Sequence, residues 1–119
     1  MAQHNDLGKR GEIKALVFLK EQDYKIITSN WQEHKFEIDI IAIDNNEIVF
    51  VEVKTRATDF FGSPEEAVTI AKQQHLIEGA NYYLEQNEID LNARFDVIGI
   101  VMNENKTVIN HIKDAFSAF

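Results

Sequence analysis

Apolar residues recur along the chain in two different periods, and the change of period divides it into helices and strands. Near the N-terminus, Ala15, Leu16 and Leu19 form a stripe at helical spacing. This stripe predicts a helix over residues 6–22, with Asp6 as its N-cap. Three segments rich in β-branched and aromatic residues follow, and they predict strands over residues 24–31, 36–44 and 47–55.

The second half of the chain repeats this order. Ser63, Pro64 and Glu66 have the pattern of a capping box with proline at the first helical position, so we expect one helix from there to residue 86. Two more strands are predicted over residues 94–102 and 107–112, and the final DAFSAF predicts a short helix that packs Phe116 and Phe119. The order predicts a single α/β domain over residues 1–119, with a mixed central sheet flanked by helices and a parallel connection across the second helix.

The Asn45-Asn46 pair suits a tight two-residue hairpin turn between the second and third strands, because asparagine tolerates positive φ. With these two residues as the loop, Asp39 lies opposite Glu52, and Glu37 lies opposite Lys54. Opposed Cβ atoms are about 5 Å apart. Glu52 and Lys54 also share one face of their strand, since side chains alternate. Two carboxylates and an ammonium group are therefore predicted to converge on one patch.

Two opposed carboxylates repel each other, and a divalent cation would remove this conflict. Mg²⁺ (or Mn²⁺) prefers oxygen ligands, and beside a phosphate it would neutralise charge and lower the pKa of a bound water. Lys54 would orient that water or stabilise the charged transition state. Glu12 is a carboxylate on the apolar stripe of the first helix, where an unpaired charge is costly, and it would approach the same patch.

These motifs, taken in order, resemble those of the PD-(D/E)xK nuclease superfamily, whose core is restriction-endonuclease-like. The closer resemblance is to the YraN-like family of small bacterial predicted endonucleases, which are similar to archaeal Holliday-junction resolvases. The matching motifs are G-x-x-G-E ending at Glu12, E-I-D-I-I-A, F-V-E-V-K-T-R, F-G-S-P, a helical Lys72 and R-F-D-V. In one departure, His34-Lys35-Phe36 stands where the family usually has a glycine before its E-I-D.

The resemblance implies a metal-dependent endonuclease that hydrolyses phosphodiester bonds in DNA, with branched or junction DNA as an expected substrate. It implies a catalytic set formed by Glu12, Asp39, Glu52 and Lys54. The implied ligands of Mg²⁺ or Mn²⁺ are Asp39, Glu52 and the carbonyl of Val53, and the implied phosphate contacts are Arg56 and Lys72. Branched DNA must be cut on two strands together, so we also expect a two-fold homodimer.

The charge of the chain opposes simple nucleic-acid binding. The formal net charge is −8 and the isoelectric point is near 4.9, whereas a basic surface supplies most of the affinity for nucleic acid. A local basic strip beside metal-binding carboxylates is compatible with an acidic remainder. The chain has no cysteine, which excludes disulfides and thiolate metal sites. With no signal segment and no long apolar run, we expect a cytoplasmic protein without a membrane partner.

Other interpretations stay open beside the nuclease. The chain could be a nucleic-acid-binding or adaptor module that keeps the fold without cutting, or a metal-dependent hydrolase of small phosphorylated molecules, although it has no P-loop. Glu37 and Lys54 could form an ordinary ion pair. We expect Arg94 and Asp96 to pair with each other. We interpret several aromatic residues as packing or incidental: Phe60, Phe61, Tyr82, Tyr83 and the four histidines His4, His34, His75 and His111.

Overall fold

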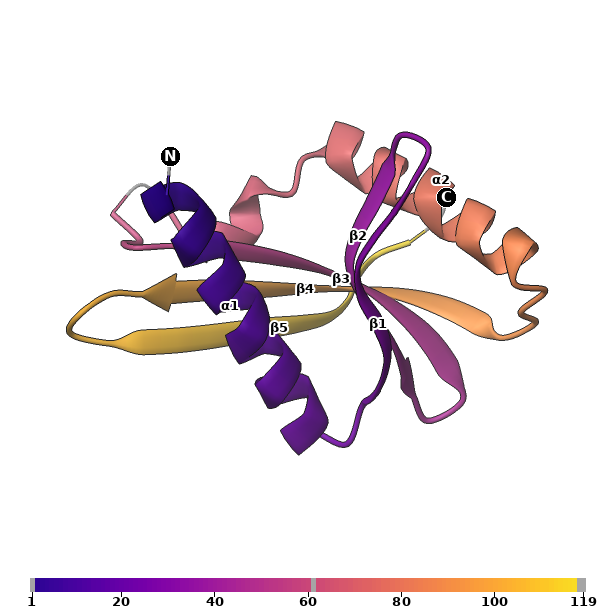
Figure 1. The fold of residues 1–119 in the computed structure, drawn as a ribbon, viewed down its shortest axis with the longest axis horizontal. Coiled ribbons are helices and arrows are strands. Elements are labelled where there is room, and N and C mark those ends of the chain that lie inside the picture. The colour runs from indigo at the N-terminus through magenta and orange to yellow at the C-terminus, as the bar shows by residue number, and fades with distance from the viewer. Residues whose placement is uncertain (1, 61, 118–119) are drawn as a thin grey trace.

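The computed structural model describes residues 2–60 and 62–117 (Figure 1). Two helices and five strands follow one another in the predicted order, with a short 3₁₀ helix added. The elements are α1 (Ala2–Glu21), β1 (Lys25–Glu33), β2 (Phe36–Asp44), β3 (Glu47–Arg56), η1 (Pro64–Ala67), α2 (Ile70–Gln86), β4 (Asn92–Met102) and β5 (Thr107–Phe116). Among the described residues, no helix is both long and apolar enough to span a membrane.

The five strands form one mixed sheet in the order β1-β2-β3-β4-β5. The first three strands are antiparallel neighbours, β3 and β4 are parallel, and β4 and β5 are antiparallel. Asn45 and Asn46 have φ values of 54° and 118°, as a tight hairpin requires. The pairs from Asp44–Glu47 to Ile40–Val51 have the predicted register. The predicted fold class is therefore confirmed, including the parallel crossover through α2.

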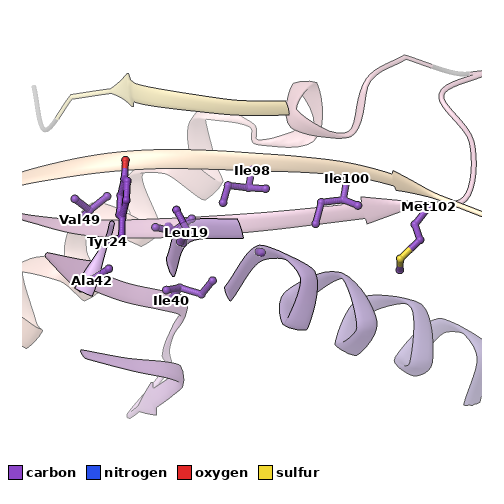
Figure 2. Close-up of a cluster of buried hydrophobic side chains, with 10 residues drawn as sticks. Leu19, Tyr24, Ile40, Ala42, Val49, Ile98, Ile100 and Met102 are labelled. Atoms are coloured by element: carbon purple, nitrogen blue, oxygen red, sulfur yellow. The ribbon is translucent and has the colours of Figure 1, made fainter. Parts of the chain in front are cut away.

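Each face of the sheet has its own apolar core. The core beside α1 joins residues from the helix to the even-numbered positions of β4, and Figure 2 shows its ten buried side chains, eight of them labelled. Its buried members are Ala15, Leu19, Tyr24, Ile40, Ala42, Val49, Val51, Ile98, Ile100 and Met102. The core beside α2 contains Ile38, Ile41, Ile48, Phe50, Val68, Leu76, Ala80, Tyr83, Phe95 and Val97. The sheet is thus a buried layer between two helices.

A close contact fixes α1 against β3. A Cβ atom at Gly11 would lie 1.9 Å from the Thr55 side-chain oxygen, well inside any allowed contact. Threonine is stiff at χ1, so it cannot easily rotate away. Glycine at position 11 therefore allows the helix to approach the strand, and the next residue, Glu12, is half-buried.

Both predicted helix starts are wrong. α1 begins at Ala2, so Asp6 lies inside the helix and does not cap it. Ser63 precedes only the 3₁₀ helix η1 and makes no capping hydrogen bond with its side chain. Val68 then adopts an extended backbone and is buried in the α2-side core, which interrupts the helix. Thr69 is the true N-cap of α2, and its hydroxyl accepts from the Lys72 N–H at 3.2 Å.

The predicted C-terminal helix is also wrong over the described residues, because β5 continues to Phe116. Phe116 pairs with Phe95 of β4, and the two rings stack with centroids 5.0 Å apart. This burial favours the extended chain over a short helix. Phe119 lies outside the described residues.

Candidate functional site

The candidate site lies where β2 and β3 separate. The ladder between them ends at Ile40–Val51, although β2 still pairs with β1 as far as Phe36 and β3 still pairs with β4 as far as Arg56. Figure 1 shows the β1–β2 hairpin turning toward α2 while β3 continues beside β4. The predicted opposition of Asp39 and Glu52 falls one pair beyond the ladder. There the Asp39 carboxylate accepts the Val53 N–H at 2.8 Å, so a side chain replaces the missing strand partner.

Glu52 is the most buried carboxylate of this site, with 6% of its surface exposed. Two lysines approach the same carboxylate oxygen, Oε2: the Nζ of Lys54 lies at 3.5 Å and the Nζ of Lys72 at 3.8 Å. Lys54 lies two residues along β3, whereas Lys72 comes from the first turn of α2. The structure therefore joins Asp39, Glu52, Lys54 and Lys72, from three elements, in one cluster.

The two carboxyls of this cluster hold a proton more tightly than usual. Burial raises the pKa of Asp39, while the Val53 N–H and the two lysines oppose the shift. Burial and the negative charge of Asp39 raise the pKa of Glu52 to about 7, against the opposing charges of Lys72 and Lys54. A side-chain hydrogen bond with Asp39 adds a smaller increase to the pKa of Glu52. The metal-free pair therefore carries one proton up to about neutral pH.

Glu12 lies half-buried on α1 beside a shallow cavity that it lines with Lys9, Ile13, Leu16 and Asn30. Burial raises its pKa, and the negative charges of Asp39 and Glu37 raise it further. A hydrogen bond with Asn30 opposes these shifts. The charge of Asp39 thus acts on Glu12 across the gap between α1 and β2. Asn30, which the sequence analysis did not include in the site, holds Glu12 from β1.

We call the point where β2 and β3 separate the fork. The oxygen atoms at the fork are suited to bind a hard divalent cation. Within residues 2–60 and 62–117, no three His, Cys, Asp or Glu side chains converge as metal ligands. The available set is therefore the two carboxylates of Asp39 and Glu52 with backbone oxygen. In a strand, the N–H and C=O of one residue point to the same edge, so the Val53 carbonyl faces the edge where its N–H meets Asp39. Mg²⁺ commonly uses one or two carboxylates, with waters and substrate oxygens completing its shell.

Other predicted side chains lie outside the cluster. Arg56 is exposed at the end of β3, on the face shared by Glu52 and Lys54. Lys54 pairs with Glu52, and not with Glu37 as the alternative interpretation allowed. Phe60 is 80% exposed, so its predicted packing role is wrong, and Phe61 lies outside the described residues.

Arg94 and Asp96 pair as predicted, with Nε and Oδ1 2.9 Å apart, in a buried network on the α1 face. Asp96 also accepts hydrogen bonds from Tyr24 and from the Asp114 N–H, and it lies 2.8 Å from the His111 Nε2. Burial alone would raise the pKa of Asp96, but these partners hold it well below its usual range. His111 is therefore not incidental. The network joins β4, β5 and the start of β1.

Sequence reasoning missed Glu65. Its side chain occupies the space above Gly99, where a Cβ would lie 2.1 Å from Oε1, and Gly99 pairs with Lys54 in the sheet. Asn110 donates to Oε2, while the buried Oε1 has no hydrogen-bond partner among the described residues. A glycine inside a strand often marks such a close approach, and this was the available signal.

The fold and site define a small mixed α/β domain with an acidic pair and two lysines where two strands diverge. The chain belongs to the Uncharacterised protein family UPF0102, whose family profile matches residues 11–100. A UPF0102 protein of Flavobacterium psychrophilum is 46% identical over 119 residues, and one of Christiangramia forsetii is 44% identical over 119 residues. Both matches cover the whole of each chain. A third, from Parabacteroides distasonis, is 42% identical and covers 99% of this chain and 98% of the relative.

Proposed function

We propose that the protein is a metal-dependent endonuclease of the PD-(D/E)xK superfamily that hydrolyses phosphodiester bonds in DNA. The observation that carries this proposal is the convergence of Asp39, Glu52 and Lys54 at the fork between β2 and β3. The family match does not assign an activity. The proposal is supported by the chemistry of the cluster and by its likeness to that superfamily's motif.

The charges of the cluster suit a phosphodiester once both carboxyls are ionised. Asp39 and Glu52 then carry two negative charges, and Lys54 and Lys72 carry two positive charges, so the cluster is neutral before a cation binds. A bound Mg²⁺ or Mn²⁺ would neutralise phosphate charge and lower the pKa of an attacking water. The cluster would then be locally positive within a chain of net charge −8. Phosphate binding at this point therefore does not require a basic protein.

Each side chain has a role that follows from its position. Asp39 and Glu52, with the Val53 carbonyl, would hold the cation. Lys54 lies on the partly exposed side of Glu52 and would donate to the water or to a phosphate oxygen. Glu12 would accept a proton or a water hydrogen bond from the α1 side.

Lys72 and Arg56 would contact substrate phosphates, and these contacts are separate from the chemistry. Lys72 is one-third exposed while it faces Glu52, and Arg56 is exposed at the end of β3. Ammonium and guanidinium groups at such positions bind phosphate by charge. If the substrate is branched, two copies of the chain would act together, and sedimentation of the free and DNA-bound protein would measure this.

The test is cleavage of labelled plain duplex, single-stranded, flapped and four-way-junction DNA with Mg²⁺, Mn²⁺ or EDTA. We expect metal-dependent cutting by the wild type and its loss in Lys54→Ala and Asp39→Asn. The matched control is Glu37→Gln, which removes an exposed carboxylate from the same strand and should cut normally. Cutting that survives EDTA or Asp39→Asn would contradict the proposal.

The acidic isoelectric point of 4.9 favours a second candidate, a binding module that retains the fold without cutting. It predicts DNA binding that is the same in the presence of EDTA and in Lys54→Ala, with no cleavage of any substrate in the panel.

A further inference from the structure

A strip of aromatic and basic side chains runs along α2 and the tip of the β1–β2 hairpin, beside the candidate site. Its side chains are partly or fully exposed, and its rings contact one another. We call it the hairpin strip and define it as Trp31, His34, Lys35, Phe36, His75 and Tyr82. The proposed cleavage chemistry uses none of these residues.

The rings of the hairpin strip touch one another in sequence. The Phe36 ring lies 5.5 Å from the His75 ring and 5.7 Å from the Tyr82 ring, measured between centroids. Tyr82 continues to His34 at 5.1 Å and to Trp31 at 6.3 Å. The rings therefore form a connected cluster, in which His34 meets Tyr82 edge to face and the other contacts are tilted.

Backbone and side-chain contacts hold this surface rigid. Phe36 packs on Gly79 of α2, where an added Cβ would lie 3.3 Å from the Phe36 Cβ. The Nε2 of His75 lies 3.1 Å from the Lys35 carbonyl oxygen, which ties the hairpin to the helix. Burial raises the pKa of Tyr82, and the negative charge of Glu33 and a hydrogen bond with it raise this pKa further. The rings are therefore positioned before any ligand arrives.

The hairpin strip leads directly to the carboxylate cluster. Lys72, His75, Gly79 and Tyr82 follow one another at intervals of three, four and three residues, which places them on one face of α2. Lys72 at one end lies 3.8 Å from Glu52. At 1.5 Å per residue, the distance along the helix from Lys72 to Tyr82 is about 15 Å, or several nucleotide steps.

His34 lies at the exposed end of the strip with a left-handed backbone conformation. It adopts φ +53° in the hairpin turn, a conformation that glycine accepts far more easily than histidine. The side chain therefore has a backbone cost, and it places its ring against Tyr82 at the exposed end of the strip.

We propose that the hairpin strip binds unpaired DNA bases by stacking and directs the adjoining phosphodiester to Asp39 and Glu52. This inference rests on the proposed nuclease function and narrows its substrate to DNA with a single-stranded arm, such as a flap or a splayed branch. Stacking on aromatic side chains requires bases out of the duplex and tolerates any sequence. Glu33 beside Tyr82 repels phosphate, so bases and not the backbone face this part of the surface.

Stacking also explains how an acidic chain would retain DNA. Lys35 and Lys72 are placed to contact phosphates along the strip. These two contacts to a single strand contribute about −1.4 to the slope of log affinity against log salt. This is a weak salt dependence for a DNA-binding protein, and Lys35→Ala should reduce it by about 0.7. Lys106→Ala, in the β4–β5 turn, is the matched lysine control.

The test measures binding in EDTA, where no metal-dependent cleavage occurs, by anisotropy of fluorescein-labelled oligo(dT), blunt duplex, and duplex with a single-stranded flap. We expect oligo(dT) and the flap to bind more tightly than the duplex. Tyr82→Ala should weaken single-strand binding at least about fivefold, whereas Tyr82→Phe should retain it because the ring remains. His34→Gly should weaken binding while the melting temperature stays equal or rises, since the backbone cost is removed.

Several results would overturn the inference. Equal affinity for duplex and single strand, unchanged binding by Tyr82→Ala, or no binding of oligo(dT) by the wild type would each do so. Tighter binding of the matching RNA strand than of oligo(dT) would reject DNA as the ligand. A parallel cleavage assay with Mg²⁺ separates the two claims. Ring-dependent binding without any cleavage rejects the nuclease, whereas cleavage of plain duplex unaffected by Tyr82→Ala rejects only the strip.

Discussion

The buried carboxyl pair makes the stability of the metal-free protein depend on pH. Burial and the charge of Asp39 raise the pKa of Glu52 from 4.5 to about 7. Between these values the folded protein keeps a proton that the unfolded chain releases. The free energy of unfolding therefore falls as the pH rises from about 4.5 to 7, and this contribution is constant at higher pH. Glu52→Gln removes the titrating group, so this part of the pH dependence should disappear.

The size of the effect follows from the shift. Each pKa unit corresponds to about 1.4 kcal/mol, so a change from 4.5 to about 7 destabilises the folded protein by on the order of 3 kcal/mol above neutral pH. The side chain of Glu52 is only 7% exposed, so screening by water removes little of it. Divalent cation would reverse the effect at high pH, because it binds the ionised pair.

The assay is urea denaturation in EDTA, followed by far-UV circular dichroism, for the wild type and Glu52→Gln at pH 5 and pH 8. The wild type should lose on the order of 3 kcal/mol more than the variant between the two pH values. Subtracting the variant cancels the titrating groups that do not interact with Glu52. Glu37→Gln, an exposed carboxylate on β2, should behave as the wild type within about 0.5 kcal/mol. Equal pH dependence in the wild type and Glu52→Gln would refute the reasoning.

Three other changes test separate parts of the structure. Gly11→Ala should destabilise the protein by about 1–3 kcal/mol in urea denaturation and move α1 from the sheet, whereas Gly8→Ala, which meets no atom within 4 Å, should be neutral or stabilising. Asp96→Asn should cost about 3–5 kcal/mol by the same method, because it leaves buried partners without their anion. Lys72→Met should shift the midpoint of Mn²⁺ binding to higher pH, since the lysine charge lowers the pKa of Glu52.

The contrary outcomes are equally specific. Equal stability of the two alanine variants would mean that α1 does not approach β3 at Gly11. The depressed pKa of Asp96 gives stability that is present above the unfolded-state pKa and is lost as the pH falls through the folded one. A stability difference between wild type and Asp96→Asn that persists in strong acid would contradict this. An unchanged Mn²⁺ midpoint in Lys72→Met would remove that lysine from the electrostatics of the site.

The hairpin could be predicted because its determinants are local. Asn45-Asn46 specifies the turn, the turn fixes the register, and the register brings Asp39 near Glu52. The contacts that decide where the two strands separate are not local in the sequence. The separation depends on β2 turning with β1 toward α2, and on the Val53 N–H donating to the Asp39 side chain in place of a strand partner. The sequence therefore predicts which groups meet, but not the fork at which they meet.

The errors also have non-local causes. Ser63-Pro64 starts only the 3₁₀ helix η1, because burial of Val68 against the sheet ends that turn. The helix α2 then begins separately after its N-cap, Thr69. The chain end is extended because Phe116 stacks on Phe95 across β4 and β5. Neither contact is visible in a window of a few residues.

The central claim is that Asp39 and Glu52 form one divalent-cation site, and a Mn²⁺ titration at pH 8 followed by electron paramagnetic resonance tests it most directly. The account predicts one tight Mn²⁺ per wild-type chain, weaker binding at pH 5, and loss of the site in Asp39→Asn and Glu52→Gln. Glu37→Gln should bind as the wild type does. No bound Mn²⁺ at pH 8, or binding that is unchanged in both site variants, would contradict the account.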